Sequence, residues 1–106
     1  MDSGVISDVS IDEIDKSHDR VRFVGKAKNI DAQIGTLDVF SENKILTCIL
    51  VVNQDIKIND GDNLLVTGRV AKTDEEEIEI RVDAVQKISE SQAVVFNKYL
   101  NLRRKY

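Results

Sequence analysis

Apolar and polar residues alternate with a period of two along much of the middle of this 106-residue chain. In residues 20–28 one side of the alternation is apolar and the other carries most of the cations, which is the pattern of a half-buried strand. Residues 77–85 repeat this alternation more cleanly and predict another strand. The inward positions are Val21, Phe23, Gly25 and Ala27 in the first segment and Ile78, Ile80, Val82 and Ala84 in the second.

Three further segments, residues 34–40, 44–52 and 63–70, also have the character of strands. Residues 44–52 are apolar on both faces, so we expect this strand to be covered on both sides. Gly68 interrupts the last segment and predicts a bulge or a sharp bend. A turn at residues 59–62 precedes that segment, and an acidic loop at 72–77 follows it.

The period changes from strand to helix at Ser89. Ser89 and Gln92 form the signature of a capping box, and apolar residues then recur at steps of three and four. Their arc is wider than the stripe that a helix needs to close a small barrel, which indicates a second surface for a partner protein. A helix that only plugs the barrel is the alternative. The residues predicted to bind the partner are Val95, Phe96, Tyr99, Leu100, Leu102 and Tyr106.

Five short strands and a terminal helix predict an all-β fold, a five-stranded OB-type barrel with a C-terminal α-helix. A flat sheet of this size would leave two edges and one face uncovered. An SH3-like barrel or a small sandwich stays open, because the pattern does not give the strand order. We expect an acidic N-terminal arm or short helix at 1–19, the barrel at 20–88, and a partner-binding helix at 89–106.

The net charge of -4 argues against a protein whose main task is to neutralise phosphates, so any contact with DNA must be local. Cations of the first strand lie on its outward side, which borders the nucleic-acid groove in OB folds. They could equally form an ordinary solvated surface, and cations at the end of the helix also oppose its dipole. The residues predicted to contact nucleic acid are Arg22, Lys26, Lys28, Arg103, Arg104 and Lys105.

Catalytic chemistry has little support in the sequence. His18, the single histidine, stands beside Ser17 and Asp19, whereas a triad needs groups that converge from separate elements. Cys48 is the single cysteine and lies among apolar residues, which predicts a buried, inert thiol in a reducing compartment. There is no metal-ligand pattern, Gly-rich phosphate loop, secretory signal or membrane-spanning run. We therefore expect no enzyme, no cofactor, no metal and no membrane association.

Four segments, VRFVGKAKNID (21–31), GTLDVF (35–40), LTCILVVNQDIKI (46–58) and NLLVTGRV (63–70), carry a family resemblance. With them the chain resembles the small OB-fold subunit of the telomere-capping CST complex, a replication-protein-A-like assembly. The resemblance implies a nuclear subunit at telomeres, the chromosome ends. It would pair with a larger OB-fold subunit and hold single-stranded telomeric DNA mainly through the complex.

The small subunit of replication protein A, which acts in DNA replication and repair, is the next most similar and remains the alternative. An RNA-binding OB protein or a small enzyme would belong to another class. RNA binding predicts affinity of the lone chain for RNA, and an enzyme requires a reactive pocket.

Overall fold

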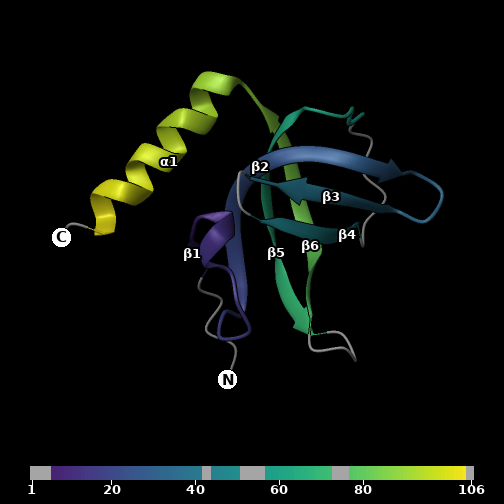
Figure 1. The fold of residues 1–106 in the computed structure, drawn as a ribbon, viewed down its shortest axis with the longest axis horizontal. Helices are drawn as coiled ribbons and strands as arrows, with labels where there is room; N and C mark the ends of the chain where they lie inside the picture. Colours follow the sequence, from purple (N-terminus) through teal and green to yellow (C-terminus); the bar gives the residue numbers. More distant parts are fainter. Residues whose placement is uncertain (1–5, 42–43, 51–56, 73–76, 105–106) are drawn as a thin grey trace.

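The computed structural model describes residues 6–41, 44–50, 57–72 and 77–104 (Figure 1). Strands and one helix make up most of these residues, and no described helix is both long and apolar enough to cross a membrane. The elements are β1 (Ser7–Asp8), the 3-10 turn η1 (Ile11–Glu13), β2 (Arg20–Asp31), β3 (Thr36–Phe40), β4 (Ile45–Leu50), β5 (Asn63–Lys72), β6 (Ile78–Ile88) and α1 (Glu90–Arg104).

Strand β2 closes the barrel because it is long enough to pair with two different strands. Its first half pairs with β5 and its second half with β3, both antiparallel. The order β2-β3-β4-β6-β5 thus returns to β2, while β1 adds to β2 in parallel outside the ring. Strands β4 and β6 are parallel, and the other barrel pairs are antiparallel. The predicted OB-type barrel with a C-terminal helix is therefore confirmed.

Gly25 lies where β2 passes from β5 to β3. A Cβ atom at this position would be 2.4 Å from Val39 Cγ1 and 3.0 Å from the carbonyl oxygen of Phe40. Both distances are shorter than an ordinary van der Waals contact, so only a residue without a side chain lets the two strands approach here.

The barrel interior is filled by apolar side chains from every barrel strand and from the segment before β2. Ile11 and Ile14 of that segment are buried in the same core, so residues 6–19 lie against the barrel. The largest fully buried side chains are Phe23, Ile14, Leu64, Ile80, Val21, Val39, Val66, Val82 and Cys48.

The predicted irregularity at Gly68 is confirmed, and it corrects the prediction for β6. Thr67 pairs with Ala84 but Gly68 pairs with Val82, so Asp83 is an extra residue in β6. One extra residue shifts the alternation by one position. As a result Ala84, predicted inward, is exposed, and Val85 is buried in its place.

Strand β4 corrects a second prediction. Leu46 and Cys48 point into the core as expected, but Ile45 on the other face is 54% exposed. The described part of this strand is therefore covered on one side only, because the barrel is a single closed layer whose outer face meets solvent. The last predicted residues of this strand, Val51 and Val52, lie outside the described residues.

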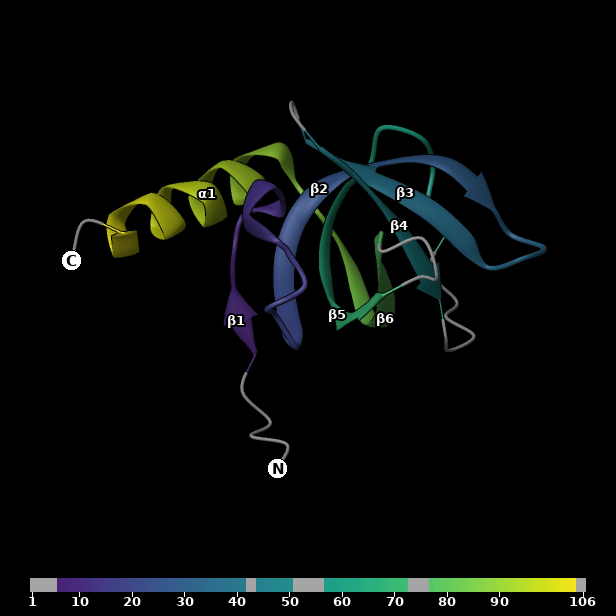
Figure 2. The ribbon, with the colours of Figure 1, turned by 60° about the horizontal axis from the view of Figure 1, so that its bottom comes forward.

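Helix α1 starts directly after β6 and extends past the rim of the barrel, so much of it does not cover a strand (Figures 1 and 2). Its contacts with the barrel are mainly with β2 and β5. A helix in this position has one side toward the barrel and a wide remaining surface.

Candidate protein interface and nucleic-acid contacts

The start of α1 is fixed by the predicted capping box. The backbone N–H of Gln92 donates to Ser89 Oγ at 3.1 Å, and the backbone N–H of Ser89 donates to Gln92 Oε1 at 2.9 Å. These two bonds satisfy backbone groups that a helix end otherwise leaves unpaired. In the same turn Glu90 Oε2 accepts a hydrogen bond from Asn63 Nδ2 at 2.8 Å and lies 3.9 Å from Lys26 Nζ. The first turn is thus attached to both β5 and β2.

One side of α1 packs toward the barrel. Ala93 and Leu100 are buried, and both border a cleft of about 570 Å³ that also contains Val24 of β2. The helix therefore explains why Val24 is buried although it lies on the outward face of its strand. Leu100, predicted to bind a partner, is 5% exposed and faces this cleft, so in this chain it serves the contact between helix and barrel.

The opposite side of α1 carries an exposed apolar stripe. Val95, Tyr99 and Leu102 are 64%, 47% and 56% exposed, and their spacing of four and three places them on one helical face. We call these three residues the apolar stripe. Scattered exposed apolar residues are common, but a continuous set on one face indicates an interaction site.

A groove of about 390 Å³ lies beside the apolar stripe, between α1 and the strands β1 and β2. Its helical wall has an apolar character because it is formed mainly by Val95, Phe96 and Tyr99. The other lining residues are Gln92, Asp8 and Arg22. Protein interfaces usually have an apolar centre and a polar rim, and this groove combines an apolar wall with a polar floor in the same way.

The floor of this groove is an ion pair that joins β1 to β2. Arg22 donates from Nε to Asp8 Oδ1 at 2.7 Å and from Nη2 to Asp8 Oδ2 at 3.0 Å. These bonds to Asp8 raise the pKa of Arg22. Arg103 of α1 lies 3.9 Å from the same carboxylate and packs over the Tyr99 ring at 5.6 Å. One acid thus ties the N-terminal segment, the barrel and the helix together.

Most of the cations predicted to contact nucleic acid have partners within the chain. Arg22 is held by Asp8, Lys26 is near Glu90, and the Lys28 ammonium lies 5.2 Å from the centre of the Phe40 ring. A paired cation attracts a phosphate more weakly, because the neighbouring acid cancels part of its field. The side chains of Arg104, Lys105 and Tyr106 are not among those that the structure describes. The roles of the whole set stay predictions.

The strand register brings Lys26, Phe40 and Ile45 into one row across β2, β3 and β4. This row places a cation beside an aromatic ring and an exposed aliphatic side chain on the outer face of the barrel. The position of Ile45 was missed in the sequence because its strand looks apolar on both faces. Only the pairing with Phe40 reveals that it extends this surface.

The reactive residues considered above are not arranged for catalysis. Burial raises the pKa of the Cys48 thiol to about 12, so at neutral pH the thiol is protonated. His18 Nδ1 accepts a hydrogen bond from the backbone N–H of Asp15 at 3.3 Å, within a surface turn. Within the described ranges, no three side chains of His, Cys, Asp or Glu cluster in a way that could hold a metal ion.

No protein-family model matches the chain, and no curated protein matches its sequence. Solved structures do match. The telomere capping protein Ten1 of S. pombe superposes with a TM-score of 0.78 at 19% identity, over 96% of this chain and 100% of that one. A chain of the S. pombe Stn1-Ten1 complex gives 0.78 at 20% identity, over 98% and 96%.

A chain of the replication protein A heterotrimer bound to single-stranded DNA gives a TM-score of 0.65 at 13% identity, over 78% of this chain and 68% of that one. The Ten1 matches cover nearly the whole of this chain, whereas the replication protein A match leaves out about a fifth of this chain. The chain therefore shares, over at least 96% of its length, the fold of the telomere capping protein Ten1.

Proposed function

We propose that this chain is a non-catalytic subunit of a telomere-capping complex and pairs with a larger OB-fold subunit through α1. The observation that carries the proposal is the apolar stripe, which one barrel leaves uncovered. Exposed aromatic and aliphatic side chains on one helical face gain free energy when a second protein removes them from water. The fold likeness to Ten1, alone and in a complex with Stn1, supports the same arrangement.

The groove beside the stripe suggests how the partner docks. A helix from the larger subunit would lie along α1, with its apolar side chains against Val95, Phe96 and Tyr99 and its polar side chains toward Asp8 and Arg22. The helix α1 is roughly 22 Å long at 1.5 Å per residue, enough for about four turns of such a contact. Stable pairs usually bury about 800 Å² per partner, so we expect the partner to contact the barrel as well.

In this proposal the complex holds single-stranded telomeric DNA, and the subunit acts in the nucleus at chromosome ends. Its own contribution to DNA binding is accessory, because the net charge is -4 and the predicted cations Arg22 and Lys26 have acidic neighbours. The small subunit of replication protein A remains the second candidate, supported by the shorter match to that heterotrimer.

The experiment co-expresses the chain with the Stn1-like subunit of the same organism and measures the complex by light scattering after size-exclusion chromatography. The double variant Tyr99→Arg/Leu102→Arg should abolish the complex, because two buried charges without partners are costly in an interface. Ile34→Arg is the matched control, since this side chain is exposed but distant from α1 in the chain. Unchanged circular dichroism must show that both variants are folded.

A complex that survives Tyr99→Arg/Leu102→Arg would contradict the proposed interface. A parallel co-expression with the larger subunit of replication protein A separates the two candidates, because only the true partner should form a complex that the double variant disrupts.

A further inference from the structure

The barrel assembles three arginines that are far apart in the sequence. Arg20 pairs with Arg69 across β2 and β5, and Arg69 pairs with Arg81 across β5 and β6. Directly opposed residues of antiparallel strands project from the same face of a sheet. We call these three residues the arginine row. Neighbouring strands are about 4.8 Å apart, so the row is about 10 Å wide.

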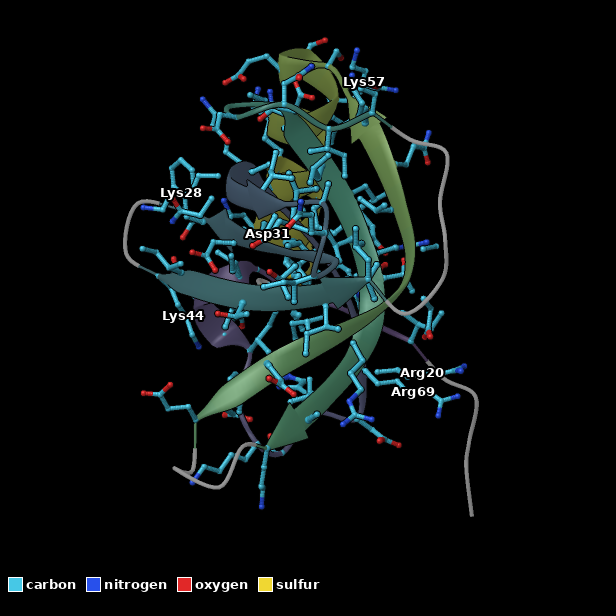
Figure 3. All side chains as sticks on the ribbon, turned by 90° about the vertical axis from the view of Figure 1, so that its right-hand side faces the viewer. Arg20, Lys28, Asp31, Lys44, Lys57 and Arg69 are labelled. Carbon is cyan, nitrogen blue, oxygen red and sulfur yellow. The ribbon has the colours of Figure 1, made fainter. Side chains whose placement is uncertain are left out.

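The arginine row lies on the outer surface of the barrel. Arg69 and Arg81 are exposed, and Arg20 is partly exposed. Figure 3 shows Arg20 and Arg69 extending side by side, on the opposite side of that view from Lys28 and Lys44. The row therefore begins with a cation of β2, Arg20, but lies away from Lys28 at the other end of that strand.

Like charges in directly opposed positions destabilise a sheet, so this arrangement needs an explanation. Two acids among the described residues lie near the row: Asp83 is 3.9 Å from Arg20, and Glu79 is two positions from Arg81 on the same face of β6. No ion pair is recorded for Arg69 or Arg81 in the same part of the chain. The three guanidinium groups outnumber these two carboxylates, which leaves a local excess of positive charge on an otherwise acidic protein.

The surroundings of the row favour phosphate over a protein surface as the ligand. Thr67 and Ala71 flank Arg69 on its strand, and Ile49 of β4, which pairs with Arg81, is the one large apolar side chain among the described residues that pair with or flank the row, too little for the centre of a protein interface. None of the described residues that pair with or flank the row is Phe, Tyr or Trp, so these residues offer no platform for base stacking. Guanidinium groups match the geometry of phosphate oxygens through paired N–H donors. A ligand with successive phosphates would meet all three groups at once.

We propose that Arg20, Arg69 and Arg81 bind the phosphodiester backbone of a single-stranded nucleic acid. This inference rests on the proposed function, in which the complex holds single-stranded DNA, and it adds a contact site on this subunit. The row binds without sequence preference, because its partners are phosphates and not bases. Asp83 weakens the contact, since its carboxylate repels the same phosphates.

The test titrates the full chain with an oligothymidine of about 20 nucleotides, longer than the roughly 4 to 16 nucleotides that one OB fold covers. Affinity is measured by fluorescence anisotropy between about 50 and 200 mM salt. For single strands each neutralised phosphate contributes about 0.7 to the slope of log K against log salt, so Arg69→Gln/Arg81→Gln should reduce the slope by about 1.4. Asp83→Asn should increase the affinity.

Lys57→Gln/Lys98→Gln is the matched control, because it removes the same charge from two exposed residues outside the row. It should leave the slope close to that of the unmodified chain. The inference is overturned if the chain does not bind the oligonucleotide at low salt, or if both double variants change the slope equally. It is also overturned if the row variant abolishes binding to vesicles of anionic lipid but not to the oligonucleotide.

The proposed function is tested separately by the same proteins. Arg69→Gln/Arg81→Gln should still form the complex with the larger subunit, whereas Tyr99→Arg/Leu102→Arg should lose the complex and still bind the oligonucleotide. If Tyr99→Arg/Leu102→Arg keeps the complex, the proposed interface has failed; if Arg69→Gln/Arg81→Gln keeps the salt slope of the unmodified chain, the phosphate site has failed.

Discussion

The barrel and the terminal helix use their apolar residues in opposite ways. In the barrel, side chains such as Phe23, Ile80 and Val66 are fully buried and contact one another across a closed interior. In α1, Leu100 is buried, but Val95, Tyr99 and Leu102 remain exposed. The barrel therefore buries most of its apolar side chains by itself, with Ile34 and Ile45 as exposed exceptions, whereas the helix leaves three apolar residues of one face exposed. Stability should depend on the first region and association on the second.

The largest expected loss of stability comes from removing a large side chain from the barrel core. Phe23 is the largest fully buried side chain, and Phe23→Ala should lower the free energy of unfolding by about 3 to 5 kcal/mol. The measurement is urea denaturation. The reactivity of Cys48 gives a second readout, because the pKa of its buried thiol is about 12 and the folded chain should not react with a thiol reagent at pH 8.

Ile34→Ala, at a position that is 73% exposed, is the control and should unfold at the same urea concentration as the unmodified chain. If Phe23→Ala behaved like this control, the interior of the barrel would not be the source of stability.

The second largest effect is expected at the bulge that determines which side chains of β6 face inward. A Cβ atom at Gly68 would lie 2.5 Å from the carbonyl oxygen of Arg81 and 2.7 Å from Ile80 Cγ2. Gly68→Ala must push two paired strands apart, at a cost of about 2 kcal/mol in the free energy of unfolding. Thr67→Ala is the matched control on the adjacent outward position. Equal urea midpoints for the two variants would refute the close approach.

The same bulge shows which parts of the fold a sequence can predict. The strands, the OB-type barrel and the capping box at Ser89 follow from local periodicity and local hydrogen bonds, and the structure confirms them. The outward position of Ala84 could not be predicted this way. The extra residue at Asp83 arises from how β6 pairs with β5, and nothing within β6 itself indicates it.

The candidate sites were predictable to a smaller extent. Periodicity places Tyr99, Leu100 and Leu102 on an apolar arc, but it does not tell which part of the arc turns toward the barrel. The contact of Leu100 with the cleft beside β2 depends on how α1 leaves β6. The arginine row depends even more on tertiary structure, because Arg20, Arg69 and Arg81 become neighbours only through the register of three strands.

Two single substitutions in α1 distinguish apolar residues that stabilise the fold from apolar residues that bind the partner. Leu100→Ala should lower the free energy of unfolding by about 2 kcal/mol, because it removes a buried side chain at the border of an open cleft. Val95→Ala should change it by less than about 0.5 kcal/mol, since that side chain is exposed. For binding to the larger subunit the order of the two effects should reverse. Val95→Ala should weaken the affinity about tenfold, and Leu100→Ala should change it less.

Urea denaturation and a binding titration on the same two proteins provide the measurements. If both variants lost the same stability, α1 would not have the two distinct faces described above.

The smallest effect concerns a polar contact at the surface of the barrel, where the turn before β5 depends on the ionised form of Asp62. Its carboxylate accepts a hydrogen bond from the backbone N–H of Asn59 at 2.8 Å and lies 3.4 Å from Lys87 Nζ. The Asn59 bond, with help from Lys87, lowers the pKa of Asp62 below its usual value of 3.8.

A lowered pKa in the folded state means that this contribution to stability is present above the ordinary pKa of an aspartate. It is lost as the pH falls through the lower pKa of the folded chain. Asp62→Asn should therefore be less stable than the unmodified chain at pH 7, and the two urea midpoints should converge as the pH falls through the lowered pKa of Asp62. Asp60→Asn removes one charge from the same turn and is the matched control. A difference between Asp62→Asn and the unmodified chain that stayed constant down to about pH 2 would mean that the Asn59 bond does not require the charged carboxylate.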